Sequence, residues 1–485
     1  MAAQVTTKKE NIFVRFGKRI AEGFRYFGER FSDGSVGTKL SHFIMGAGNF
    51  SHKQIAKGII FFLVEVVFIL FMVLCPSVND TPLGYKALIN LGDLGYIENA
   101  SGSTAIDPDT GMPIAVPNSM LILLFGVVTL GVIMLFLVVY FANISSAYKA
   151  DLDERYGEGA STFKQDLASM LDSKFHITML SPTILGVTLF TILPTLYMIL
   201  VAFTTYGGTT AGSGQTNFGW AGFENFIAIF TQPDNEIGQR FLSVLGWTLI
   251  WAFFATVTNY FGGIFLAVLI NRKGIKGKVF FRTVFIMTIA IPQFISLLAM
   301  RNLLSANGPV NAMLMNLGLT QNSINFLGHD LENQNEYLIK FMIILINMWV
   351  GVPYTMLMTS GILMNVPTDL YEAAKVDGAK PLTIFFKITF PYIFFITTPY
   401  LISSFIGNIT SFNIIFMLSG GGPAVAGFKA GKTDLLVTWL YKLTIENSNY
   451  NQGAVIGIIT FIFTSVITLL TYRRSKSYKE EDTFQ

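Results

Sequence analysis

Residues 119–142 read SMLILLFGVVTLGVIMLFLVVYFA, a stretch without a single charged side chain. About 20 apolar residues in a helix cross the hydrocarbon core of a bilayer, so this stretch predicts a membrane-spanning helix. Seven further stretches of comparable length and apolarity occur, namely Gly58–Cys75, Ile177–Phe203, Phe241–Ile270, Thr283–Met300, Phe341–Met364, Ile393–Leu418 and Gly453–Tyr472. The sequence therefore predicts an all-α polytopic membrane protein with eight transmembrane helices.

The composition agrees with lipid as the solvent. Of the 485 residues, 52% are hydrophobic and 13% are charged, whereas soluble domains carry roughly 25% charged residues. The mean hydropathy is +0.53. Disorder and an ordinary soluble enzyme are thereby excluded. The net charge of +3 and the lack of a basic tract interleaved with aromatic residues give no case for nucleic-acid binding.

The distribution of positive charge predicts the orientation. Eight spans place every second segment of the chain on the same side of the membrane. Of the 33 Lys and Arg residues, 26 lie in the five segments of one side, which are residues 1–57, 143–176, 271–282, 365–392 and 473–485. Cytoplasmic loops carry an excess of Lys and Arg. We therefore expect a protein of the cell membrane with both termini in the cytoplasm. No small-residue cleavage site precedes the first span, which predicts no removable signal peptide.

Residues 1–57 form a polar leader with an amphipathic pattern. At 100° per residue the apolar side chains fall within an arc of about 80°, opposite a cationic face. The apolar set is Phe13, Phe16, Ile20, Phe24, Phe27 and Phe31, and the cationic set is Arg15, Lys18, Arg19, Arg25 and Arg30. The pattern predicts a helix on the inner membrane leaflet. The alternative is a helix packed on the protein's own cytoplasmic face.

The spans and loops divide the rest of the chain. Residues 58–142 are expected to form two accessory transmembrane helices around an outer loop at 76–118, followed by a cytoplasmic linker at 143–176. Residues 177–472 are expected to form a core of six spans with an outer loop at 204–240, which contains the Gly-rich run 207–214, and a cytoplasmic loop at 365–392. Residues 473–485 are a cytoplasmic tail.

Residue types that carry catalysis or bind metals are sparse. The one cysteine, Cys75, allows no intrachain disulfide, and the four histidines, His42, His52, His176 and His329, show no ligand spacing. The segment Gly427–Thr433 resembles a phosphate-binding loop but has three residues between its glycines where four are needed. We expect no enzyme activity, no metal and no cofactor on this chain. Glu65 lies within the first span, where it either pairs with a neighbouring helix, stays protonated or carries protons.

The cytoplasmic loop after the sixth span reads PTDLYEAAKVDGAKPLTIFFKITFP over residues 367–391. Asp369 suits a helix N-cap with Glu372 three residues later, and Gly378 suits a helix end. Pro381 suits the first turn of a second helix. The loop therefore predicts two short helices joined by a sharp corner. An ordinary capped connector explains the same features equally well.

This loop resembles the signature of the membrane permease subunits of ATP-binding-cassette (ABC) importers. The matching residues are Glu372, Ala373, Ala374, Asp377, Gly378, Ala379 and Pro391. The resemblance implies a type I importer permease core in which this loop docks on ATPase subunits that hold ATP and Mg²⁺. The implied partners are a second permease in a heterodimer, two ATPase subunits, an extracytoplasmic sugar-binding protein and membrane lipid.

Further motifs resemble the larger permease of maltose and maltodextrin importers, the MalF type, which carries two extra N-terminal spans. They are Asn347–Tyr354 (NMWVGVPY), Ser419–Pro423 (SGGGP) and Thr433–Val437 (TDLLV). The 204–240 loop is much shorter than the folded insertion of the best-known relatives, so smaller loops are expected to contact the binding protein.

Polar side chains recur at helical spacing in spans six and seven. Asn347, Gly351 and Tyr354 share one face, as do Ser404, Asn408 and Ser411. Hydrogen bonding between helices explains this spacing without a ligand. The resemblance instead implies that Asn347, Gly351, Tyr354, Ser404 and Asn408 bind a sugar.

Ile289, Gln293, Gly407 and Ser411 differ from the residues expected at a maltose site. We therefore expect a maltodextrin or another plant oligosaccharide, such as an arabinogalactan oligomer. Two other classes of protein remain as alternatives: an ion-coupled secondary transporter and an intramembrane enzyme.

Overall fold

The computed structural model describes residues 12–97, 104–107, 109–157, 159–208, 215–231, 236–272, 274–328 and 335–474. Residues 1–11 of the leader, 209–214 of the Gly-rich run, His329 and residues 475–485 of the tail lie outside the described residues. The chain divides into two compact units, one of residues 1–200 with 215–220 and one of residues 201–214 with 221–485. Helices dominate both units, which confirms the all-α fold class.

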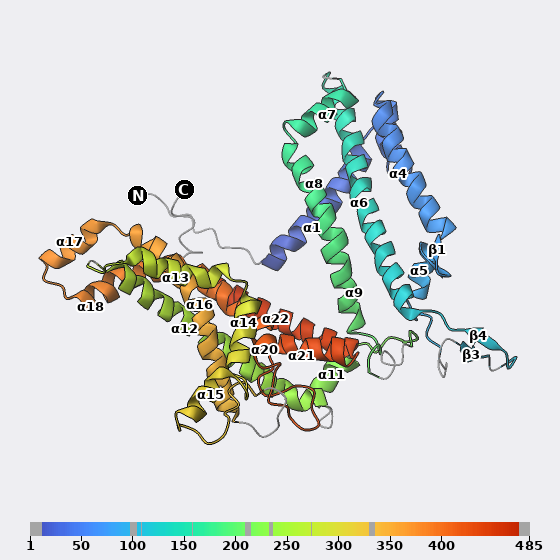
Figure 1. Ribbon diagram of the computed structural model, residues 1–485. Helices are drawn as coiled ribbons and strands as arrows, with labels where there is room; N and C mark the ends of the chain where they lie inside the picture. The colour runs from blue at the N-terminus through green and yellow to red at the C-terminus, as the bar shows by residue number, and fades with distance from the viewer. Residues whose placement is uncertain are drawn as a thin grey trace. The chain divides into compact units, whose positions relative to one another are not determined.

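The first unit contains three long apolar helices and a set of short elements (Figure 1). Its helices are α1 (Ile12–Asp33), α2 (Val36–Leu40), α3 (Ala47–Ser51), α4 (Ile55–Leu74), α5 (Tyr85–Asn90), α6 (Ser119–Arg155), α7 (Phe163–Leu171) and α8 (Phe175–Val187), followed by the π-helical turn η1 (Thr188–Ile192) and α9 (Leu193–Val201). Two hairpins lie in the 76–118 loop, β1 (Ser77–Val78) with β2 (Thr81–Pro82) and β3 (Thr104–Ile106) with β4 (Pro113–Ala115).

The leader forms the predicted helix α1, and its C-terminal end contacts the rest of the unit. The Phe27 ring lies edge-on to His42 at 5.0 Å, and Arg30 Nη1 donates a hydrogen bond to Ser145 Oγ at 2.6 Å. The C-terminal end of α1 therefore packs in part on the protein itself, as the alternative to lipid contact described.

The second unit is built around a closely packed pair of long helices. Its helices are α11 (Glu224–Thr231), α12 (Glu236–Asn271), α13 (Lys278–Ala290), α14 (Gln293–Leu303), α15 (Pro309–Asn316), α16 (Glu336–Met364), α17 (Thr368–Val376), α18 (Pro381–Ile384), α19 (Phe390–Ile409), α20 (Phe412–Leu418), α21 (Leu436–Tyr441) and α22 (Tyr450–Arg474), with π-helical turns η2 (Phe385–Thr389) and η3 (Lys442–Glu446).

Helices α12 and α16 approach so closely that small residues are needed between them. A Cβ atom on Gly263 of α12 would lie 2.4 Å from Thr355 Cβ of α16. Trp247 and Trp251 of α12 pack with Ile339 and Ile343 of α16 in the main buried cluster. Small residues at such contacts are typical of helices that associate in a membrane.

Two of the predicted spans are not single straight helices. The stretch Thr283–Met300 is divided between α13 and α14, which meet at an angle of 94°. Ile291 adopts an extended conformation because Pro292 follows it. The stretch Ile393–Leu418 is divided between α19, which ends at Ile409, and α20. Among the described residues, seven helices are long and apolar enough to cross a membrane, or up to eight if the bent pair is one span.

Candidate functional site

The loop at residues 365–392 forms the two predicted short helices, α17 and α18, and the corner between them. Gly378 has φ +74°, a conformation that favours glycine, and Ala379 N donates to Ala374 O at 2.9 Å. Pro381 occupies the first turn of α18, as predicted. The predicted N-cap is wrong: Pro367 occupies the N-cap position, and Asp369 lies inside the first turn, where its charge still favours the helix dipole.

The two short helices project from one end of the second unit (Figure 1). Glu372 and Asp377 are exposed, as are Val376 (88%) and Leu382 (72%). Ala374 and Ala379 are half-buried, Ala373 is exposed, and Pro391 opens α19. Exposed apolar side chains beside charges are typical of a surface that a protein partner covers.

A side-chain contact connects α17 to the helix that follows the corner. The Tyr371 hydroxyl lies 3.2 Å from the Thr389 hydroxyl, and Thr389 is buried at the end of η2. The turn η2 leads directly into α19, so a displacement of α17 can pass to the apolar part of α19 through this contact and the continuous backbone.

A cavity of about 390 Å³ lies where α13 breaks into α14. Irregular backbone inside a membrane is tolerated where it lines such a cavity. The wall combines residues of the break with residues of α12, α13, α14, α16 and α19. Its residues are Asn259, Thr288, Ile289, Ala290, Ile291, Pro292, Gln293, Ser296, Val350, Gly351, Tyr354 and Tyr400.

Two of the five predicted sugar-binding residues, Gly351 and Tyr354, line this cavity. The Tyr354 and Tyr400 rings have centroids 6.0 Å apart with planes inclined at 31°. Ile289 and Gln293, which differ from the residues expected at a maltose site, lie in the same wall. The wall therefore offers aromatic faces together with amide and hydroxyl groups, as carbohydrate recognition requires.

The other three predicted sugar-binding residues do not line the cavity. Asn347 is 3% exposed, and Ser404 and Asn408 are half-buried in α19. Asn408 Nδ2 donates to Thr256 Oγ1 at 2.9 Å, and Asn408 O accepts from Trp251 Nε1 at 3.1 Å. These contacts with α12 are the hydrogen bonds between helices that the packing alternative describes.

Asn259 and Tyr400 are cavity residues that the sequence did not identify. A Cβ atom on Gly351 would lie 2.2 Å from Asn259 Nδ2, so the glycine makes room for this amide. Asn259 Oδ1 is buried and has no hydrogen-bond partner within the described residues. An asparagine three residues before Gly262-Gly263 in an uncharged span was the available signal, but periodicity could not tell which neighbour it faces.

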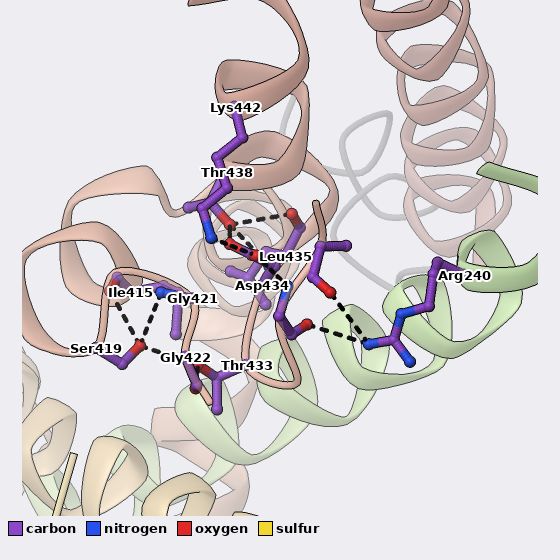
Figure 2. Close-up of polar contacts among 12 residues, drawn as sticks. Arg240, Ile415, Ser419, Gly421, Gly422, Thr433, Asp434, Leu435, Thr438 and Lys442 are labelled. Carbon is purple, nitrogen blue, oxygen red and sulfur yellow. Dashed lines mark hydrogen bonds and ion pairs between the residues drawn. The ribbon is translucent and has the colours of Figure 1, made fainter. Parts of the chain in front are cut away.

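Figure 2 shows how the SGGGP and TDLLV motifs form one hydrogen-bond network in the segment between α20 and α22, which includes α21. The Ser419 and Thr433 hydroxyls lie 2.9 Å apart, and Gly421 N donates to Ser419 Oγ at 3.2 Å. Arg240 Nη2 of α12 donates to Gly431 O at 3.3 Å. The network fixes this loop against α12.

Asp434 is the buried centre of this network (Figure 2). It accepts hydrogen bonds from Gly431 N at 2.7 Å and Thr438 Oγ1 at 2.8 Å. It also pairs with Lys442 Nζ at 2.7 Å. Burial raises the pKa of the Asp434 carboxyl, and the Lys442 ammonium opposes that shift. Gly421 has φ +83°, and a Cβ atom there would lie 2.0 Å from Asp434 Oδ1.

Residues Gly427–Thr433, which resemble a phosphate-binding loop, belong to the segment that contains the Asp434 network. Lys432 Nζ lies 3.3 Å from Glu336 Oε2, and the Thr433 hydroxyl donates to Gly422 O. Within the described ranges no three His, Cys, Asp or Glu side chains gather where they could hold a metal ion.

Long apolar helices, a broken helix at a cavity and a projecting helical corner are features that membrane-transport permeases have. Residues 259–475 match the family described as "binding-protein-dependent transport system inner membrane component". The chain is 32% identical over 446 residues to the galactooligosaccharides transport system permease protein GanP of Bacillus subtilis (strain 168), covering 91% of this chain and 98% of the relative. It is 31% identical over 448 residues to the maltodextrin transport system permease protein MdxF of the same organism, covering 91% and 96%.

The chain therefore belongs to this family of permease subunits, which confirms the resemblance to ABC carbohydrate-importer permeases. A crystal structure of a bacterial alginate ABC transporter in complex with alginate pentasaccharide-bound periplasmic protein has the same fold, with a TM-score of 0.50, 20% identity, and coverage of 63% of this chain and 94% of that chain.

Proposed function

We propose that this chain forms one half of the translocation pathway of an ATP-driven oligosaccharide importer. It pairs with a second permease in a heterodimer and with two ATPase subunits, and it receives sugar from an extracytoplasmic binding protein. Both termini face the cytoplasm, because the positively charged loops, including the one with α17 and α18, then lie on the side where ATP is available.

The observation that carries the proposal is the exposed corner of α17 and α18. Val376, Leu382 and Glu372 offer a mixed apolar and charged surface that no described part of the chain covers. The contact between Tyr371 and Thr389 connects this surface to α19, which contributes Tyr400 to the cavity. Closure of an ATPase dimer on the corner would thus reach the cavity wall.

The cavity and the relatives together support an oligosaccharide as substrate. Relatives named for galactooligosaccharides and for maltodextrin have similar identity to this chain. We propose a maltodextrin, with a galactooligosaccharide or a plant oligosaccharide such as an arabinogalactan oligomer as the alternative. Gly351 and Tyr354 contact the sugar in the cavity, and Asn347, Ser404 and Asn408 contact it in a state in which their helices have moved.

Charge reversal in the coupling corner tests the proposed function. In the assembled importer, Glu372→Lys should reduce ATP-dependent sugar uptake at least tenfold, a loss of about 1.4 kcal/mol or more in coupling. The matched control is Asp172→Lys, a reversal of an exposed charge in the 143–176 linker. Membrane insertion of both variants should be normal. Unimpaired uptake by Glu372→Lys would contradict docking at this corner.

A panel of oligosaccharides tests the substrate. Uptake of labelled maltodextrins, galactooligosaccharides and arabinogalactan oligomers is measured with the cognate binding protein present. We expect maltodextrins to compete best, and uptake confined to a non-glucan sugar would overturn that assignment while leaving the importer class intact.

A further inference from the structure

The segment between α1 and α4 exposes most of its large apolar side chains, Met45 excepted, and buries several polar ones. We call residues 36–51, which contain α2 and α3, the inverted segment. Its exposed side chains are Val36 (76%), Leu40 (47%), Phe43 (73%), Ile44 (49%) and Phe50 (40%). Thr38, Ser41 and Asn49 are fully buried. Water selects the opposite distribution, with apolar residues inside.

The buried polar groups bind to one another and to α6. Asn143 of α6 accepts from Gly46 N at 2.8 Å and donates to Ser41 O at 3.0 Å. Tyr140 of α6 donates to His42 O at 2.9 Å. Asn49 Nδ2 donates to Ser146 Oγ at 3.0 Å. Backbone that enters lipid needs such internal partners for its polar groups.

We call Phe43–Gly46 the tip of the inverted segment. The tip contacts the N-terminal half of α4. Met45 N donates to Glu65 Oε2 at 2.8 Å. Glu65 is ten residues beyond the first residue of α4, which at a rise of about 1.5 Å per residue places its backbone about 15 Å along the helix. Gly46 lies beside Gly58, about 5 Å along the same helix, so the tip lies along roughly the first 5–15 Å of α4, within one leaflet of a hydrocarbon core about 30 Å thick.

Apart from Glu65, whose carboxylate accepts from Met45 N, the charges of this region lie at the base of the inverted segment, where it joins α1 and α4. No Asp, Glu, Lys or Arg occurs between Lys39 and Lys53, and Lys57 at the start of α4 pairs with Asp166 of α7. The exposed tip is apolar and lies beside the first turns of an apolar helix, so its surroundings suit a lipid acyl chain better than water.

We propose that the inverted segment is a re-entrant element that enters the leaflet at the N-terminal end of α4 and contacts lipid acyl chains through Phe43 and Ile44. The chain then first enters the hydrocarbon core upstream of residue 58, within the region that the sequence assigned to the cytoplasmic leader. α1 continues the same surface, since the Phe31 and Phe43 rings lie 6.4 Å apart.

Spin labels on single cysteines test the proposal in the full chain, assembled with its partners in lipid nanodiscs. The background is Cys75→Ser, which removes the one native thiol. Labels are placed by Phe43→Cys at the tip and by Ile44→Cys as a second tip position. The references are Leu63→Cys on the exposed face of α4 and Lys53→Cys at the base.

Collisions with oxygen, which dissolves in lipid, are compared with collisions with a water-soluble nickel chelate. We expect the oxygen-to-nickel ratio at both tip labels to match Leu63 and to exceed Lys53 several-fold. Nickel access at the tip equal to that at Lys53 would overturn the proposal, because the tip would face water. Protection of the tip labels from both reagents would also overturn it, because protein would then cover the tip.

Discussion

Gly351 shows how one residue serves two purposes in the cavity wall. Its position in α16 satisfies both the sugar-site interpretation and the packing interpretation, because it lines the cavity and also leaves room for the Asn259 amide. The two interpretations are therefore compatible at this residue. They differ in what a small side chain at this position would change.

A methyl group at Gly351 should displace Asn259. We expect Gly351→Ala to cost about 1–3 kcal/mol through overpacking and to lower sugar uptake, and the double variant Gly351→Ala with Asn259→Ser to recover part of the stability. The matched control is Gly361→Ala in the same helix, where nothing lies within 4 Å of the new methyl group. Denaturation and uptake are measured for each variant. Equal effects at 351 and 361 would refute the role of Asn259.

The Glu65 carboxylate, for which the sequence left pairing, protonation and proton transport open, has a hydrogen-bond partner in the structure. It accepts from Met45 N at 2.8 Å. We expect Glu65→Leu to lower the free energy of unfolding by about 1–3 kcal/mol, because the Met45 amide loses its acceptor. Glu65→Gln keeps an acceptor and should retain both stability and uptake. Loss of uptake in a stable Glu65→Gln variant would instead favour the proton-carrier alternative.

At the scale of elements, the loop from α20 to α22 depends on a buried ion pair. The Asp434 side chain is fully buried and the Lys442 side chain is 14% exposed. Removing one charge of such a pair leaves the other buried without compensation, at a cost of about 3–5 kcal/mol.

We therefore expect Lys442→Met to destabilise the protein by about 3 kcal/mol or more, and Lys442→Arg to cost less because the charge remains. The double variant Lys442→Met with Asp434→Asn should cost less than the sum of the single changes. Thermal unfolding of the purified protein measures each effect. Strict additivity of the two single changes would show that the pair does not couple.

At the scale of the whole molecule, the energy source distinguishes the proposed importer from an ion-coupled transporter. In proteoliposomes that hold the complete complex, we expect uptake to require ATP on the side of the α17–α18 corner and to persist with an uncoupler present. Liposomes that lack the ATPase subunits are the control. Uptake that an uncoupler abolishes and that ATP does not affect would exclude the importer.

The presence of the long helices and the all-α membrane fold class were predictable, because the length of an apolar stretch can be read from the sequence itself. The stretch Ser119–Ala142 became part of α6, and Gly378 ended α17 as its conformational freedom requires. The bend at Ile291–Pro292 was less predictable, because a proline in a span either kinks a helix or ends it according to its neighbours. Asp369 was misplaced because two residues ahead of it, Thr368 and Pro367, also suit a helix start.

The candidate site was only partly predictable for a different reason. Helical spacing places Asn347, Gly351 and Tyr354 on one face, but it does not say which helix that face meets. Neighbours contributed by α12, α14 and α19 decided that Gly351 and Tyr354 line a cavity and that Asn408 bonds to Thr256.

By itself the sequence determined that this chain is a membrane protein, which segments are apolar enough to cross a membrane, and which loop resembles the signature of an ATPase-coupled permease. These features depend on local composition and spacing along one chain. The tertiary structure decided that Asn259 and Tyr400 belong to the cavity, that Glu65 holds a backbone amide, and that residues 36–51 bury their polar side chains. Those outcomes depend on which helices lie side by side, and the close packing of side chains between helices is not encoded in the periodicity of any one of them.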